Sequence, residues 1–523
     1  MPIPAPNTPW LPAPWDTAYR SFAENDAWYT GDTAALAKMY RRDAAAQATH
    51  QHRGQPMRGG LVGAATRMFW GRPVPAGENR VRLHVPAPAD LAALASDLVF
   101  AEPPEVKLEK TLRAVGRAQD RLDLIANGDE AHATFNQMGE LKSALGAVAL
   151  VVRWDTTVAD HVWLEPSAAD VIIPTFRMGR MVECTLWSEY VKGSVYYRHL
   201  EHHMVGAIEH ALYAGSENNL GRRVPLTEIA ETSTYAELVD DDSRILTNID
   251  RLTAIYNPNI PTAAWRKKGV LANTGRSDFA QLHSLFDSLD ETFSSWMRDL
   301  RLGAGKILVP EAALDYTGLG QGASFDSGRE IFAGLNMPGR PGEVAFDKVQ
   351  FEIRTEAHEK TAFAIYREIL RKAGFSQSAW GDYTGVTGQM TATEVSDREK
   401  ASERTRDKKI LQERVAIGRA ASVALEIDGL VFPGKGGGRF DQPTVVFPDV
   451  SQEDPEKLAR TLTLLDTASA ISLEQKVRRA NPDWEDPQIE EEVAKIQAER
   501  AVVTPAAFTG DDPDREDPEV DGA

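Results

Sequence analysis

Apolar side chains recur at steps of three and four residues in two segments of the chain. The first predicts a helix over 277–302, with Ser277 as its N-cap, from Phe279, Leu282, Phe286, Leu289, Phe293, Trp296 and Leu300. The second predicts a helix over 356–373 from Ala362, Phe363, Tyr366, Ile369, Leu370 and Ala373, with Gly374 as its C-cap. A strict seam of this kind packs against another helix, so we expect the two segments to pair.

The polar sides of these two segments carry opposite charges. The first has Asp278, Asp287, Asp290 and Glu291, and the second has Lys360, Arg367, Arg371 and Lys372. We expect the basic side either to line a passage or to pair with the acidic helix.

A glycine-punctuated loop over 374–390 leads into a much longer helix, predicted from Thr391 to Ile427. That segment has no proline and a single glycine, Gly418. At 1.5 Å per residue the helix spans roughly 55 Å, far more than the usual three turns.

The long helix carries two charged rows, each repeating every four residues. The acidic row is Glu399, Glu403 and Asp407, and the basic row is Lys400, Arg404 and Lys408. Each row repels itself within one chain. One interpretation is a solvated helix surface; the other is that the acidic row of one copy faces the basic row of the next, a contact that can close a ring.

The rest of the chain divides by pattern. Helices are predicted at 33–48, 88–100, 109–127 and 129–145, and a period-two antiparallel meander at 147–213, with turns at 178–180 and 192–193. Residues 1–24 hold six prolines before Trp15 and are expected to form an extended arm. Residues 303–350 are expected to be a small β-rich insertion, 434–439 a flexible turn between strands, 455–499 two or three helices, and 506–523 a disordered acidic tail.

Composition narrows the function. The chain has 523 residues and a formal net charge of −19, which argues against a conventional nucleic-acid binder but not against a surface that DNA passes without sticking. The N-terminus lacks the apolar stretch of a secretory signal, and the longest apolar run, 144–152, is too short to cross a bilayer. The single cysteine, Cys184, fits a reducing compartment and is expected to be a small buried hydrophobe.

No motif predicts a catalytic site, a cofactor or a metal. The segment 303–307 has a Gly-Lys pair, but Ile307 replaces the Ser or Thr that binds Mg²⁺, and the segment follows a helix instead of preceding one. His199 and His203 are predicted to share one strand face and His202 and His210 the other, without zinc-site spacing. Nucleophile motifs are absent, although the many carboxylates leave open an alternative, a soluble acidic hydrolase that uses paired carboxylates.

Several longer motifs resemble the portal proteins of siphovirus-like tailed bacteriophages, the head-to-tail connector family. The resemblance covers roughly residues 15–450. The motifs are WYTGD (28–32), RMFWG (67–71), RLHVPAPADLAALASDLVFAEPP (82–104), RHLEHH (198–203) with IEHALY (208–213), GRSDFAQLHSLFDSLDETFSSWMRDLRLG (275–303) and TATEV (391–395).

The resemblance implies an α+β, portal-type fold. It implies a mixed α/β wing over 25–276, a stem of two helices at 277–302 and 351–373, and a clip at 303–350. It further implies a tunnel loop at 374–390, a long spine helix at 391–427 and a helical crown at 428–505. The implied protein is a non-enzymatic ring, expected to be a dodecamer, at one vertex of the virion capsid, assembled in the host cytoplasm.

The implied partners are double-stranded DNA, passing without sequence specificity, the terminase large subunit, a head-tail adaptor, and the major capsid and scaffolding proteins; no membrane is implied. Gln377, Trp380, Tyr383 and Gln389 are expected to face the DNA channel from the tunnel loop. The stem is expected to present Lys360, Arg367 and Arg371, and the charged rows of the long helix are expected to join neighbouring subunits.

A simple geometric estimate agrees with twelve copies. Twelve helices packed 8–10 Å apart around a circle give a diameter of roughly 31–38 Å between axes. Subtracting one helix diameter leaves roughly 20–28 Å, about enough for one DNA duplex.

Overall fold

The computed structural model describes most of the chain. The residues it describes are 3–38, 83–109, 115–263, 265–267, 269–302, 306–308, 315–316, 323–324, 347–349, 353–377, 392–448, 455–481, 484 and 486–503. They form two compact units, residues 1–448 and residues 449–523. The fold is mixed, with helices and antiparallel sheets in the first unit and helices in the second, so an α+β class is confirmed.

The N-terminal arm is shorter than predicted. Residues 15–24 are not extended but belong to helix α1, Trp15–Thr30. All six prolines precede Trp15, and Trp15, Ala18 and Phe22 are buried at steps of three and four residues, so this apolar face favours a helix from Trp15 onward. The preceding residues do run outside a helix, and a hydrogen bond from the Leu220 amide to the Thr8 carbonyl fastens them to the sheet.

The period-two segment folds as two antiparallel sheets. The smaller has the order β10-β2-β3, formed by Ala254–Pro258, Ala147–Arg153 and Trp163–Ala168. The larger follows the chain order β4-β5-β6-β7-β8, with β9 also pairing β7. Its strands are Ile172–Arg177 (β4), Arg180–Lys192 (β5), Val195–Met204 (β6), Ala207–Ser216 (β7), Asn219–Val224 (β8) and Arg244–Leu246 (β9).

The predicted meander is therefore confirmed from residue 172 onward, including the turns at 178–180 and 192–193. Strand β2 does not alternate between apolar and polar residues. Residues 147–152 are buried on both faces of the sheet and form an unbroken apolar run.

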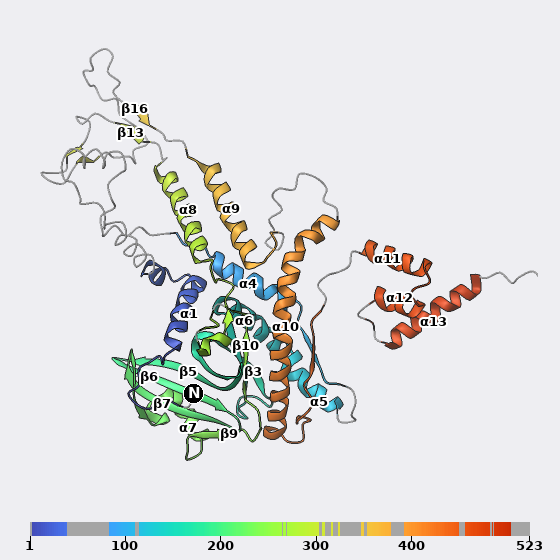
Figure 1. Ribbon diagram of the computed structural model, residues 1–523, viewed down its shortest axis with the longest axis horizontal. Helices are drawn as coiled ribbons and strands as arrows, with labels where there is room; N and C mark the ends of the chain where they lie inside the picture. Colours follow the sequence, from blue (N-terminus) through green and yellow to red (C-terminus); the bar gives the residue numbers. More distant parts are fainter. Residues whose placement is uncertain are drawn as a thin grey trace, which may run out of the picture. The chain divides into compact units, whose positions relative to one another are not determined.

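Helices pack around these sheets (Figure 1). Those predicted at 88–100 and 129–145 are confirmed as α4, Ala87–Phe100, and α6, Asp129–Leu145. In the helix predicted over 109–127, residues 110–114 lie outside the described residues; residues 115–127 form α5, Val115–Leu122, and a π-helical turn, Asp123–Asn127. Residues 33–38 are helical, and the rest of the helix predicted over 33–48 lies outside the described residues. Helix α7 is Ala230–Leu238, and three short 3₁₀ turns are Ala169–Val171, Leu226–Glu228 and Gly269–Asn273.

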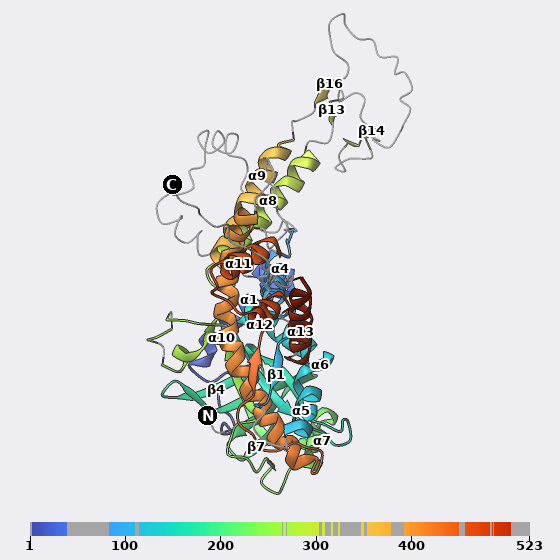
Figure 2. The same ribbon diagram turned by 90° about the vertical axis from the view of Figure 1, so that its right-hand side faces the viewer.

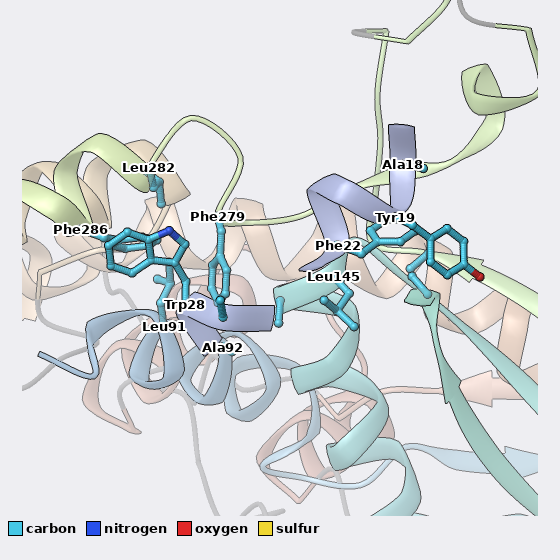
Figure 3. Close-up of a cluster of buried hydrophobic side chains, with 14 of the residues drawn as sticks. Ala18, Tyr19, Phe22, Trp28, Leu91, Ala92, Leu145, Phe279, Leu282 and Phe286 are labelled. Carbon is cyan, nitrogen blue, oxygen red and sulfur yellow. The ribbon is translucent and has the colours of Figure 1, made fainter. Parts of the chain in front are cut away.

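One buried cluster joins α1, α4 and α6 to the segment that enters the next helix. Figure 3 shows Trp28 of α1 beside Phe286, whose ring centroid lies 5.5 Å away. The Tyr19 hydroxyl donates to the Ile172 carbonyl (2.9 Å), which fixes α1 against the larger sheet. The base of the predicted helix pair is thus part of the main hydrophobic core.

The predicted helix pair is present as α8, His283–Leu302, and α9, Thr355–Ala373, which lie side by side in both views (Figures 1 and 2). The chain between them contains the strand pairs β13–β16 and β14–β15, as expected for a β-rich insertion. Those strands are Lys306–Leu308, Asp315–Tyr316, Ala323–Ser324 and Asp347–Val349. A short pair, β11 (Ile260–Pro261) with β12 (Gly275–Arg276), precedes α8.

The long helix is α10, Ala392–Val431, with 40 residues. The helix continues past its predicted end at Ile427 and includes Val431. The strand expected directly before the turn at 434–439 is therefore wrong. A Cβ at Gly429 would lie 2.5 Å from the Gly437 backbone, so glycine at this position lets the returning chain pack on the last turn. The chain then forms β17, Thr444–Val446, which pairs with β1, Glu105–Lys107.

The described part of the second unit contains three helices, where two or three were predicted: α11, Pro455–Thr467, α12, Leu473–Ala480, and α13, Asp486–Val503. The predicted disordered tail, 506–523, lies outside the described residues. Among the helices that the structure describes, none is both long and apolar enough to span a membrane.

Candidate functional site

The α8–α9 hairpin is held together by apolar contacts near its base and polar contacts further along. Phe286 and Leu289 of α8 and Ile369 of α9 are almost fully buried. The Trp296 ring stacks on the His358 ring, with centroids 6.1 Å apart. The apolar seam predicted from the sequence is confirmed at its buried end, while Leu300 at its far end is 40% exposed.

The ion pair that the structure shows between α8 and the start of α9 involves an acid outside the predicted set, and the pairing of the predicted acids with the predicted bases stays a prediction. Asp299, not one of the predicted acids, joins the helices by accepting hydrogen bonds from Arg354 (2.8 Å) and His358 (2.9 Å). These donors, with His358 the larger contributor, lower the pKa of Asp299. Asp278 and Asp290 instead contact other parts of the body, Lys409 and His84.

The three residues predicted for the stem's polar face differ in exposure. Lys360 is exposed and pairs with Glu356 on its own helix, and exposed Arg371 pairs with Glu368. Arg367 is half-buried. Lys360 and Arg371 thus form pairs within α9 on a solvent-facing side.

The root of the hairpin is a buried ionic network that the sequence did not reveal. Helix α8 does not start at Ser277 as predicted; residues 278–282 form turns, and Asp278 is buried in the protein interior. There its carboxylate accepts hydrogen bonds from Lys409 Nζ of α10 (2.6 Å), Ser143 Oγ of α6 (2.7 Å) and Asn259 Nδ2 (2.9 Å). The expected cap residue, Ser277, accepts a hydrogen bond from the Phe279 amide (2.9 Å) in this turn and donates one to the Ala144 carbonyl (2.6 Å).

A second buried pair lies one turn further along α10. Lys142 of α6 contacts Glu413, which also accepts from Asn257 Nδ2 of β10 (2.7 Å). Lys142 and Glu413 are each about 1% exposed. Burial lowers the pKa of Lys142, and the Glu413 carboxylate opposes that shift. We call the two pairs, Asp278–Lys409 and Lys142–Glu413, the root network, because together they tie α6, β10, α10 and the entry to α8.

The start of the predicted tunnel loop is also pinned to α10. Gly374 adopts φ +89°, and its carbonyl accepts a hydrogen bond from Thr405 Oγ1 (2.7 Å). Two residues later the Ser376 amide donates to Ser402 Oγ (2.8 Å). Gln377, the first of the residues predicted to face DNA, is exposed; Trp380, Tyr383 and Gln389 lie outside the described residues.

Replacing Gly374 with alanine is expected to destabilise the protein by about 1–2 kcal/mol. The left-handed backbone disfavours a side chain, and the added Cβ would lie 2.7 Å from Thr405 Oγ1. The matched control is Gly193→Ala, where φ is +65° but nothing lies within 4 Å of the added Cβ. Urea denaturation followed by tryptophan fluorescence compares them, and equal losses for both variants would contradict the pinned loop.

The described residues of the two charged rows of α10 are exposed, which both interpretations of the rows require. Glu403, Asp407, Lys400, Arg404 and Lys408 are all exposed, and the Glu399 side chain lies outside the described part. The opposite side of the helix is buried, including Arg406, Lys409 and Glu413 from the same charged stretch. The side chains of both rows therefore lie on the solvent-facing side of the helix.

The histidines of β6 and β7 form a buried cluster. His199 and His203 share a face as predicted, but His210 joins them, because it lies directly opposite Glu201 in the antiparallel register; its prediction to the other face is wrong. His199 Nε2 lies 3.1 Å from His210 Nδ1, and the Tyr235 ring of α7 packs against both rings, tilted on His199 and stacked on His210, at 4.8 and 5.0 Å between centroids. His202 does occupy the other face, 2.9 Å from Thr185 Oγ1.

Arg153 and Glu201 form an ion pair beside these histidines. Burial raises the pKa of Glu201, but the contacts with Arg153 and His203 lower it more. The pKa of Glu201 therefore lies well below its ordinary value. Burial lowers the pKa values of His199, His202 and His210 to about 4 each, so these rings are neutral near pH 7. Among the described residues, no group of three His, Cys, Asp or Glu side chains could hold a metal ion.

Cys184 is fully buried next to this cluster's strand, and burial raises the pKa of its thiol to about 12. That environment agrees with the packing role predicted for it.

Comparison with known proteins finds similarity between this chain and solved structures. No family model matches the chain, and no curated protein matches it. Chains from gene transfer agent (GTA) particles are similar to it. One, from the neck of the empty particle computed with C6 symmetry, is 15% identical, with 83% of this chain and 97% of that chain covered and a TM-score of 0.39.

Two further matches come from the same kind of particle. A chain of the native particle's virion is 15% identical, with 80% of this chain and 98% of that chain covered and a TM-score of 0.38. A chain of the native particle's neck, computed with C12 symmetry, is 16% identical, with 82% and 96% covered and a TM-score of 0.38.

Proposed function

We propose that this chain is the repeating subunit of a phage-type portal. In this role many copies, expected to be twelve, form a ring at one vertex of a virion capsid. The ring is a passive channel for double-stranded DNA during packaging and ejection. It would dock the terminase motor first and head-tail adaptors afterwards, and the chain itself would catalyse no reaction.

The observation that carries this proposal is the α8–α9 hairpin and the way it is anchored. A channel wall built from repeated helix pairs needs each pair to keep a fixed angle to its subunit. The Asp278–Lys409 contact (2.6 Å) and the aromatic cluster around Phe286 supply such an anchor at the base of α8. The strand pair β13–β16 brings the two ends of the insertion together, as a clip at the tip of a stem requires.

The position of the loop after α9 supports the same role. The hydrogen bonds of Gly374 and Ser376 to α10 fix where the loop starts, directly after the C-terminal end of α9. We propose that Gln377, Trp380, Tyr383 and Gln389 follow from that point toward DNA, with Lys360, Arg367 and Arg371 presented by the stem.

Mass photometry of the purified full-length protein tests the proposal. Twelve times 57.5 kDa is about 690 kDa, so a population near that mass, or near another multiple that closes a ring, is expected. Particles of 57.5 kDa alone, at every protein concentration accessible to the instrument, would contradict it.

A further inference from the structure

The solvent-facing side of α10 carries an apolar and basic stripe. At about 100° per residue, Arg404, Lys408, Leu411, Val415 and Arg419 lie within an arc of about 80°. Leu411 is 60% exposed and Val415 is 43% exposed. Arg404, Lys408 and Arg419 form no ion pair within the part of the chain that the structure describes. We call these five residues the basic stripe.

Residues of opposite charge lie at the end of α7 and in the turn that leads to β9, with an exposed leucine at the end of β9. We call Glu237, Leu238, Asp241, Asp242 and Leu246 together the acidic turn. Leu238 is 53% exposed and Leu246 is 60% exposed. Asp240 shapes this turn by accepting from the amides of Asp242 and Arg244 (3.0 and 2.8 Å). The carboxylates of Glu237, Asp241 and Asp242 have no ion-pair partner in the described ranges.

The two charged rows of α10 are poorly placed to pair with each other around a ring. Copies related by a small rotation touch through nearly opposite sides of the subunit. Both rows leave α10 on the same side, because the other side is buried in the body. The basic row therefore needs a partner surface elsewhere on the neighbouring copy.

The acidic turn meets that requirement. Its charge is opposite to that of the basic stripe, and it exposes two leucines that can pack against Leu411 and Val415. Both views place α7 away from the middle of α10, so the two surfaces lie on different parts of the subunit (Figures 1 and 2). We propose that the basic stripe of one copy docks on the acidic turn of a second copy of this chain. The contact is heterologous, so it can repeat from copy to copy and close a ring. This inference rests on the proposed ring and names the surfaces that would build it.

Charge reversal in the full-length chain tests the pairing. One variant carries Arg404→Glu and Lys408→Glu, a second carries Glu237→Lys and Asp241→Lys, and a third combines all four changes. Each two-residue variant is expected to raise the concentration at which half of the rings dissociate by at least about tenfold, because like charges then face each other across the contact. The combined variant is expected to restore assembly. Mass photometry over a dilution series measures all three.

The control is Glu217→Lys, an exposed acid in the turn between β7 and β8 and outside both surfaces. It should assemble like the wild type, and circular dichroism should show that every variant is folded. If the two-residue variants assemble like the wild type, or the combined variant stays dissociated, the pairing is wrong while the ring remains. A wild-type protein that never exceeds one chain would overturn the proposed function itself.

Discussion

Replacing Lys409 with methionine is expected to destabilise the protein by about 3–5 kcal/mol. The change leaves the Asp278 carboxylate buried, with the neutral donors Ser143 and Asn259 but no cationic donor. A buried charge without its partner is among the most costly single defects in a folded protein. The loss should appear as a lower urea midpoint of the tryptophan signal, because Trp28 belongs to the same cluster as the segment entering α8.

The matched control is Lys372→Met, which removes an exposed lysine from α9 and should cost less than about 1 kcal/mol. If Lys409→Met does not fold, the double variant Asp278→Asn with Lys409→Met keeps the test open, because neutral groups carry no unpaired charge and should recover much of the loss. A Lys409→Met midpoint equal to that of the wild type would show that the root network does not hold the hairpin.

Acidification from pH 7.5 to pH 5 is expected to cost several kcal/mol of folding stability. His199, His202 and His210 have pKa values of about 4 in the fold, against about 6.5 in the unfolded chain, because burial disfavours their charged forms. Below pH 6.5 the unfolded chain binds protons that the folded chain does not. Stability is therefore complete above that pH and is lost as the pH falls toward 4, by about 2 kcal/mol for each histidine at pH 5.

Urea midpoints at the two pH values measure this dependence. Phenylalanine in place of both His199 and His210 should remove most of it while keeping the stack with Tyr235. His132→Phe, on the outer part of α6, is the control and should leave the dependence unchanged. The window stops at pH 5 so that protonation of carboxylates adds little. A wild-type midpoint that does not move between pH 7.5 and pH 5 would contradict the buried neutral histidines.

The parts of the fold that the sequence predicted are those with strong, uninterrupted periodicity. Helix α6, the α8–α9 seam and α10 all have apolar or helix-favouring runs bounded by clear stops such as Gly146 and Gly374. The errors involve residues whose side chains make tertiary contacts that the local sequence pattern does not indicate. Ser277 and Asp278 look like a helix start, but buried contacts to α6 and α10 bind both, so α8 begins later at His283.

The candidate site was harder to predict because burial does not follow residue type. Lys408 is exposed and Lys409 is buried, although both lie in one run of charges. A signal was present: Lys409 and Glu413 stand at helical spacing from Ala416 and Ala420, which continue the buried side of α10. Their partners, Asp278 and Lys142, lie more than a hundred residues away, and no local pattern connects them.

Cryo-electron microscopy of the purified full-length protein tests the central claim most directly. The account predicts closed rings around an open axis, wide enough for a DNA duplex, with the hairpins of 283–302 and 355–373 next to the hole. Single compact particles with no symmetry axis, or rings whose axis is bordered by the sheet of 172–224 instead, would contradict it.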